Sequence, residues 1–172
     1  MKSALFTAAF VLAFFAFLRV DEITSSQTNM TFGHAIVFKN VIANEDSISI
    51  VLETSKTDQF RNGVNIIVLK QTDTAVCPLN HLKKYLACRP PFGGPLFCHY
   101  GGKPLTRYQF SAVLNKALDA AYLSKHGHFG THSFRIGCAT YSAMQGYSNE
   151  DIQHMGRWKS SAYKTYIRIP CF

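Results

Sequence analysis

The chain opens on an almost uninterrupted apolar run over residues 4–18, which ends at Arg19. The run is short for a bilayer-spanning helix, which needs about 20 apolar residues. With Lys2 before it, the run also resembles a signal peptide, but Phe17-Leu18-Arg19-Val20 contains no small-residue cleavage site. A helix that is apolar all round is normally buried. The run therefore predicts a buried helix of a globular domain that brings Arg19 to a functional site.

The composition supports a single packed domain. Apolar residues make up 47% of the 172 residues and charged residues 16%, which excludes a disordered tail. A chain of this length is the size of one domain, so we expect residues 1–172 to form one unit. The formal net charge of +8 and the pI near 9.4 favour a polyanionic partner such as nucleic acid.

The five cysteines do not predict a disulfide framework, because their number is odd and their spacing is irregular. We expect reduced thiols. A zinc site could be drawn from five side chains, but their spacing does not match that of paired zinc ligands: Cys77, His81, Cys88, Cys98 and His99. The sequence thus predicts no metal and no cofactor.

Three short segments have the composition of strands: residues 33–38, 47–52 and 64–69. A polar stretch that contains Lys56 and ends in Asn62-Gly63 separates the second segment from the third. These features predict a small antiparallel sheet near the N-terminus, with Lys56 at a hairpin tip.

The rest of the chain is predicted to be mainly helical, which makes the fold class α+β. Pro78 suits a helix start, and Thr106 and Ser148 suit N-caps. The second helix should bury a stripe formed by Phe110, Val113, Leu114, Ala117 and Leu118. The expected helices cover residues 78–87, 106–121, 132–145 and 148–155, and a last helix capped by Ser160 carries Tyr163 and Tyr166.

Residue types suited to phosphodiester chemistry recur in a fixed order. Arg19 is followed far downstream by His132-Ser133-Phe134-Arg135, Gly156-Arg157-Trp158 and Tyr166-Ile167-Arg168. A tyrosine can attack a phosphate, and the planar guanidinium groups of arginines can bind the negatively charged phosphate oxygens. A histidine can carry the proton near neutral pH. Each residue type alone is common in ordinary structural roles, so the prediction depends on the ordered set.

The spacing of these residues suggests how they would act together. Glu22 follows Arg19 at helical spacing and could orient its guanidinium, and His132 and Arg135 share one helix face. The phenol of a tyrosine ordinarily has a pKa near 10, so its proton must leave as it attacks. Lys56 on its hairpin could return a proton to the leaving oxygen.

With these residues in view, the chain resembles the catalytic domain of the tyrosine recombinases, the phage-integrase-like enzymes, over nearly its whole length. Residues 17–23 resemble the first arginine box of the family, and Ser55-Lys56-Thr57-Asp58 resembles its lysine element. Residues 131–137 match its His-x-x-Arg box, and Tyr166-Ile167-Arg168 matches its nucleophile box. The amino-acid sequences of these boxes are most like those of recombinases from eukaryotic mobile elements, such as cryptons and tyrosine-recombinase retrotransposons.

The resemblance implies DNA strand cleavage and rejoining through a 3′-phosphotyrosyl link to Tyr166, without metal or nucleotide. A partner strand's 5′-hydroxyl would reverse the step. Arg19, Arg135 and Trp158 would hold the phosphate, Lys56 would protonate the leaving oxygen, and His132 would manage the phenol proton. The implied partners are double-stranded DNA and further copies of the chain on that DNA, with no membrane and no small-molecule ligand. A eukaryotic origin would imply the nucleus rather than secretion.

The chain departs from the family pattern in three places. Arg157 fills the family's His or Trp position by spacing, whereas Trp158 fills it by residue type. The chain begins inside the catalytic domain, so the N-terminal core-binding domain is absent, and few residues follow Tyr166. Tyr163 is the rival nucleophile.

The same sequence features also permit other functions. The chain could be a truncated DNA-binding remnant of a mobile element without recombination activity. A type IB topoisomerase would share the chemistry, and a secreted protein would lose Arg19 with its leader.

Overall fold

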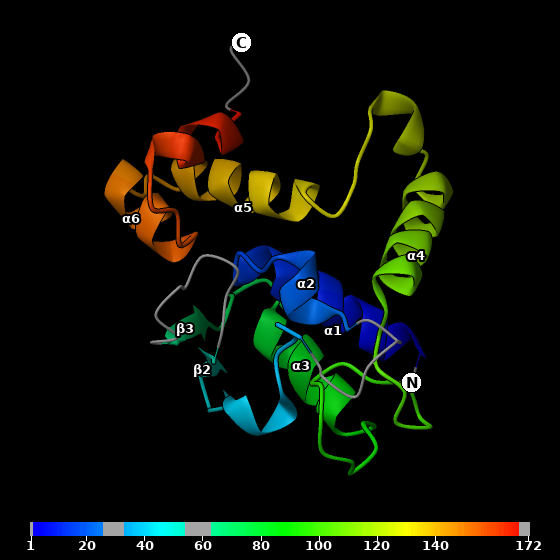
Figure 1. Ribbon diagram of the computed structural model, residues 1–172. Coiled ribbons are helices and arrows are strands. Elements are labelled where there is room, and N and C mark those ends of the chain that lie inside the picture. Colours follow the sequence, from blue (N-terminus) through cyan, green and yellow to red (C-terminus); the bar gives the residue numbers. More distant parts are fainter. Residues whose placement is uncertain (1, 26–32, 54–62, 169–172) are drawn as a thin grey trace.

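The computed structural model describes residues 2–25, 33–53 and 63–168. Within these ranges the fold is α+β and mainly helical, with one small antiparallel sheet, as the sequence predicts (Figure 1). The elements in chain order are α1 (Lys2–Phe15), α2 (Val20–Ile23), η1 (Phe38–Asn40), β1 (Val41–Ala43), β2 (Ser47–Leu52), β3 (Val64–Leu69), α3 (Pro78–Leu86), α4 (Arg107–Ala120), η2 (Ser124–His126), α5 (Ser133–Met144), α6 (Asn149–Met155) and η3 (Ser161–Tyr166), where η marks a 3₁₀ helix.

Helix α1 lies in the middle of the molecule, with α5 on one side and α3 and the sheet on the other (Figure 1). This position explains its lack of a polar face. Leu5, Leu12 and Ala13 on α1 are buried, and they belong to one core with the inward side chains of α3 and β2. Gly137 on α5 lets the two helices approach closely, because a Cβ there would lie 3.0 Å from the Phe14 ring. The predicted buried helix is confirmed, and none of the described helices is long and apolar enough to cross a bilayer.

The sheet has the order β1-β2-β3, and both pairings are antiparallel. Alternation of side chains places Ile48 and Ile50 of β2 in the core, opposite Val68 and Ile66 of β3. The predicted strands over 47–52 and 64–69 are confirmed. The predicted strand over 33–38 is wrong: in that segment Val37 forms only an isolated bridge with Pro95, and β1 starts after the η1 turn.

The remaining helices follow the predicted caps. Pro78 starts α3, and the Thr106 and Ser148 hydroxyls accept the backbone N–H three residues on, at the starts of α4 and α6. The predicted inner stripe of α4 is wrong apart from Phe110, which alone is buried. Helix α4 projects with η2 away from the other elements (Figure 1), so its other apolar side chains stay partly or fully exposed.

The four cysteines in the described ranges form no disulfide. The same ranges contain no group of three or more His, Cys, Asp or Glu side chains placed to hold a metal ion.

A second, smaller hydrophobic core lies where α5, α6 and η3 meet the end of α1. Its buried members are Phe17, Cys138, Ala139, Ile152 and Tyr163. Half-buried Trp158 and Tyr166 pack against it. The three C-terminal sequence clusters and the segment that carries Arg19 are therefore brought to one place.

Candidate active site

The short segment between α1 and α2 positions Arg19. Helix α1 ends at Phe15, and Phe17 adopts a left-handed backbone conformation with φ of +50°, which is unusual for a residue with a large side chain. Arg19 is then the N-cap residue of α2, and Glu22 stands at its third position. The sequence predicted that Glu22 could orient Arg19 if the first helix continued. The pairing is present, but it arises from the start of a new short helix.

Glu22 is a buried carboxylate, 2% exposed, that binds two arginine side chains of the site. Its oxygens accept the Arg19 backbone N–H at 2.8 Å and the Arg19 Nη1 at 3.3 Å. One of them also accepts the Arg157 Nη2 at 2.7 Å. Two guanidinium groups thus share one carboxylate, which leaves positive charge in excess.

Arg135 is the third guanidinium of the cluster and is only 3% exposed. Its Nη1 donates to the carbonyl oxygen of Phe17, and its Nη2 donates to that of Gly156 at 2.8 Å. The guanidinium carbon lies 4.5 Å from the centre of the Trp158 ring, which is a cation–π contact. Arg135 therefore connects α5 to the end of α1 and to the turn after α6.

The pKa of Arg135 reflects its neighbours. Burial, and then the positive charges of Arg19 and Arg157, lower this pKa to about 10. The charges of Glu22 and Tyr166 act in the opposite direction. Arg135 stays cationic at neutral pH, and the pattern shows that Arg19, Arg135, Arg157, Glu22 and Tyr166 interact electrostatically as one cluster.

Trp158 packs directly on the two C-terminal tyrosines. Its ring centre lies 4.9 Å from that of Tyr166 and 6.4 Å from that of Tyr163. Gly156 makes room for it, because a Cβ at this position would lie 1.6 Å from the Trp158 ring. The glycine of the Gly156-Arg157-Trp158 cluster is therefore required by the packing of the indole.

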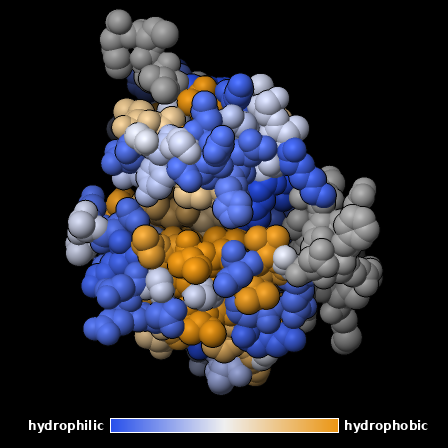
Figure 2. Space-filling model, turned by 90° about the vertical axis from the view of Figure 1, so that its left-hand side faces the viewer, coloured by the Kyte–Doolittle hydropathy of each residue, from blue (hydrophilic) through white to orange (hydrophobic). Residues whose placement is uncertain are grey.

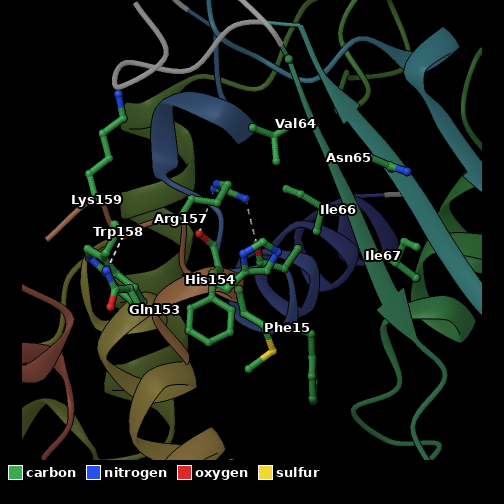
Figure 3. A pocket seen from close by; sticks show the side chains of 14 residues that line it. Phe15, Val64, Asn65, Ile66, Ile67, Gln153, His154, Arg157, Trp158 and Lys159 are labelled. Atoms are coloured by element: carbon green, nitrogen blue, oxygen red, sulfur yellow. Dashed lines mark hydrogen bonds between the residues drawn. The ribbon is translucent and has the colours of Figure 1, made fainter. Parts of the chain in front are cut away.

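Arg157 and Trp158 contact different residues of the site. Arg157 has a left-handed backbone, φ +57°, and its side chain turns inward to Glu22 and to the carbonyl of Phe17, at 3.2 Å. Its Nε is buried without a partner among the described residues. Figure 3 shows both side chains at a pocket of about 630 Å³ between β3, the end of α1 and α6. Arg157 thus contacts Glu22, whereas Trp158 contacts Tyr166.

His132 and Tyr166 face each other at the edge of the cluster. Their ring centres lie 4.8 Å apart in an edge-to-face arrangement. His132 stands at the N-terminal boundary of α5 and is exposed, and burial of part of the ring together with the charges of Arg135 and Arg168 lowers its pKa. The lowered pKa favours the neutral imidazole, which is the form that can accept a proton.

The two tyrosines of η3 differ in their surroundings. Tyr163 is 6% exposed and belongs to the second hydrophobic core. Tyr166 is half-buried and lies between His132 and Trp158. A phenol that must reach a phosphate needs access to solvent, so the surroundings favour Tyr166 over Tyr163.

The structure brings together Arg19, His132, Arg135, Trp158 and Tyr166 of the predicted set. Lys56 lies outside the described residues. The sequence analysis assigned no role to the Phe17 carbonyl and the Thr140 hydroxyl, which bind members of the cluster. No sequence signal distinguishes these two residues, because both contacts depend on how distant segments pack.

The hydrophobic surface near the pocket lies on the side formed by α6 and the sheet, as Figure 2 shows. The outward residues of the sheet contribute Val51, Ile67 and Leu69, all exposed. Phe15, Val64, Ile66 and Met155 line the pocket itself.

No protein-family model matches the sequence, and comparison with curated protein sequences gives no match. Solved structures do resemble the fold. The XerH site-specific recombinase bound to its palindromic difH substrate superposes with a TM-score of 0.71 at 17% identity, over 97% of this chain and 42% of that one. The integrase of transposon Tn1549 in complex with circular intermediate DNA gives 0.61 at 14% identity, over 96% and 56%.

A dimer of lambda integrase bound to a core site gives a TM-score of 0.61 at 18% identity, over 96% of this chain and 56% of that one. At these identities the likeness shows the fold. The chain spans roughly half the length of each of these recombinases. Its fold is that of a large part of three proteins solved in complex with DNA.

Proposed function

We propose that the chain is the catalytic domain of a tyrosine recombinase, spanning residues 1–172, and that it cleaves and rejoins DNA strands through a 3′-phosphotyrosyl intermediate. The observation that carries the proposal is the single cluster that joins Arg19, Arg135 and Trp158 to the facing pair of His132 and Tyr166. The fold shared with DNA-bound recombinases and the net charge of +8 support it.

In the proposed reaction, the Tyr166 hydroxyl oxygen attacks the scissile phosphorus and the bond to the 5′-oxygen breaks. The partly exposed guanidinium of Arg19 holds the phosphate, and the positive charge of buried Arg135 stabilises the charge that develops on the phosphate oxygens. Neutral His132 accepts the phenol proton, and Lys56 donates a proton to the leaving 5′-oxygen. A 5′-hydroxyl of the partner strand reverses these steps. Neither a metal ion nor a nucleotide takes part.

Trp158, rather than Arg157, is proposed to fill the family's His or Trp position. Trp158 contacts both Tyr166 and Arg135, whereas Arg157 is directed to Glu22. Arg157 would then support Arg19 through the carboxylate that the two side chains share.

The chain is also proposed to work in a particular cellular setting. The sequence boxes are most like those of recombinases from eukaryotic mobile elements, so we place the protein in the nucleus as part of such an element. It would act on double-stranded DNA and associate with further copies there, as the lambda integrase dimer does on its core site.

A covalent-capture experiment tests the function. The protein is incubated, in the presence of a chelator, with nicked suicide duplexes that carry a randomised core, and denaturing gels reveal any protein–DNA adduct. We expect an adduct with the wild type and with Tyr163→Phe, and none with Tyr166→Phe. An adduct that survives in Tyr166→Phe contradicts the choice of nucleophile.

The same experiment separates the main alternative. Retention of the duplexes on native gels without an adduct would support a DNA-binding remnant that does not recombine. Absence of both binding and adduct would contradict both functions.

A further inference from the structure

Thr140 lies in the middle of α5, on the side that packs against η3. Its hydroxyl donates to the carbonyl oxygen of Tyr166 at 3.2 Å and accepts the backbone N–H of Arg168 at 3.0 Å. One side-chain oxygen thus binds the main chain on both sides of Ile167. Within the described ranges, no other hydrogen bond joins residues 166–168 to α5.

The two backbone groups have no partner within η3. Tyr166 is the last residue of η3, and Ile167 has an extended backbone with φ of −83° and ψ of 113°. Carbonyl groups at the end of a helix need partners outside it, and the N–H of Arg168 lies beyond the helix. The Thr140 hydroxyl satisfies both groups and fixes where the helix ends relative to α5.

From this arrangement we propose that Thr140 is a positioning residue for the nucleophile: its hydroxyl fixes the backbone around Tyr166, so that the phenol is held between His132 and Trp158. The inference rests on the proposed function. Thr140 is not a catalytic residue, because it acts only through the main chain of Tyr166 and Arg168.

The geometry of the site makes such positioning important. Among the described residues, the Tyr166 side chain has ring contacts with His132 and Trp158 and no hydrogen-bond partner. The direction of its phenol is therefore set by its backbone and by packing. A displacement of about 1 Å in a reacting group can slow an enzymatic step by about 100-fold. The same bonds place Arg168, whose charge contributes to the lowered pKa of His132.

Three threonine variants test the proposal. Thr140→Val keeps the shape of the side chain and removes the hydroxyl, while Thr140→Ser keeps the hydroxyl. Thr165→Val is the matched control, because the Thr165 hydroxyl bonds to Ala162 within η3 and not to α5. The readouts are the single-turnover rate of adduct formation at saturating nicked duplex, the apparent Kd for that duplex, and the melting temperature.

We expect Thr140→Val to slow adduct formation by about 10- to 100-fold with an unchanged Kd. Thr140→Ser should recover most of the rate, and Thr165→Val should cleave like the wild type. A merely structural threonine would instead lower the melting temperature and leave the rate of the folded protein unchanged. If Thr140→Val does not fold, Thr140→Ala is measured against Thr140→Ser by the same criterion.

The outcomes distinguish this inference from the function on which it rests. Wild-type cleavage by the folded Thr140→Val or Thr140→Ala variant overturns the positioning role, while an inactive Tyr166→Phe keeps the proposed function intact. If the wild type forms no adduct, or if Tyr166→Phe still forms one, the function itself fails and the role of Thr140 falls with it.

Discussion

The two hydrophobic cores of the molecule are built differently. The larger one joins α1, α3 and the inner face of the sheet through aliphatic and aromatic side chains. The smaller one, beneath α5, α6 and η3, has five buried members and is bordered by the buried charges of Glu22 and Arg135. Both cores contain buried hydrogen bonds, such as those of the Tyr85 hydroxyl in the first. Among the described residues, only the second is bordered by ion pairs to a buried carboxylate, those of Glu22 with Arg19 and Arg157. The candidate site lies on the second.

This difference predicts where charge matters most. Replacing Glu22 with Gln removes the carboxylate shared by Arg19 and Arg157. The change leaves the largely buried guanidinium of Arg157 and the partly exposed one of Arg19 without compensation. Breaking a buried ion pair typically costs about 3–5 kcal/mol of unfolding free energy. The control Asp21→Asn breaks an exposed pair with Arg107 at 3.4 Å, for which we expect about 0–1 kcal/mol. Denaturant unfolding measures the free energy of unfolding of both variants. Equal losses would contradict the expectation that the buried ion pairs of Glu22 contribute more than the exposed pair of Asp21.

A matched pair of cavity variants compares the cores directly. Leu12 and Ile152 are both 0% exposed, one in each core. Truncation to Ala should cost about 2–5 kcal/mol at either site. Hydrogen exchange should separate them: Leu12→Ala should increase exchange throughout the domain, and Ile152→Ala mainly in α5, α6 and η3. Identical exchange patterns would show that the two cores unfold as one unit.

The indole of Trp158 should affect the rate of adduct formation. Trp158→Leu removes its cation–π contact with buried Arg135, and such contacts are worth about 2 kcal/mol when desolvated. We expect adduct formation to slow by at least about 10-fold, which corresponds to about 1.4 kcal/mol. Trp158→Phe, which keeps an aromatic face, should lose less. Equal losses in the two variants would argue against a role for the ring.

The smallest expected effect concerns the protonation of His132. Arg168→Gln removes one of the charges that lower the His132 pKa, so this pKa should rise toward its usual value. The acid limb of the cleavage profile should move to higher pH, because a protonated imidazole cannot accept the phenol proton. Arg168→Lys keeps the charge and is the control. NMR titration of the imidazole measures the shift, and a pKa that falls in Arg168→Gln contradicts the assignment.

The lowered pKa also has a consequence for stability. Because the folded state disfavours protonated His132, the contribution of this residue to the free energy of unfolding is largest above the usual histidine pKa, where the imidazole is neutral in both states. That contribution is lost as the pH falls through the folded-state value.

Local signals accounted for most of the fold. The Thr106 and Ser148 caps and the alternation in β2 and β3 act between residues close in sequence, and the structure confirms the elements they predicted. The predicted strand over residues 33–38 is wrong because only Val37 forms a bridge, with Pro95. That partner lies far along the chain, so local sequence patterns do not reveal how limited the pairing is. The predicted stripe on α4 failed because the helix projects away from the body. A stripe of half-buried residues has the same sequence pattern as a fully buried one.

The sequence predicted which residues form the candidate site, but not how their side chains are arranged. The order of the boxes pointed to Arg19, His132, Arg135 and Tyr166. The inward turn of Arg157 depends on its left-handed backbone, which sequence spacing does not reveal. Lys56 remains a prediction, since it lies outside the described residues.

Trp158 is the sole tryptophan of the chain, and it packs between the guanidinium of Arg135 and the ring of Tyr166. Selective excitation of indole fluorescence therefore gives an optical signal that originates from the candidate site alone. An oligonucleotide that engages the arginine cluster should change the intensity or wavelength of this emission in the unlabelled protein. The chain thus carries a built-in reporter with which ligands can be screened before any cleavable sequence is known.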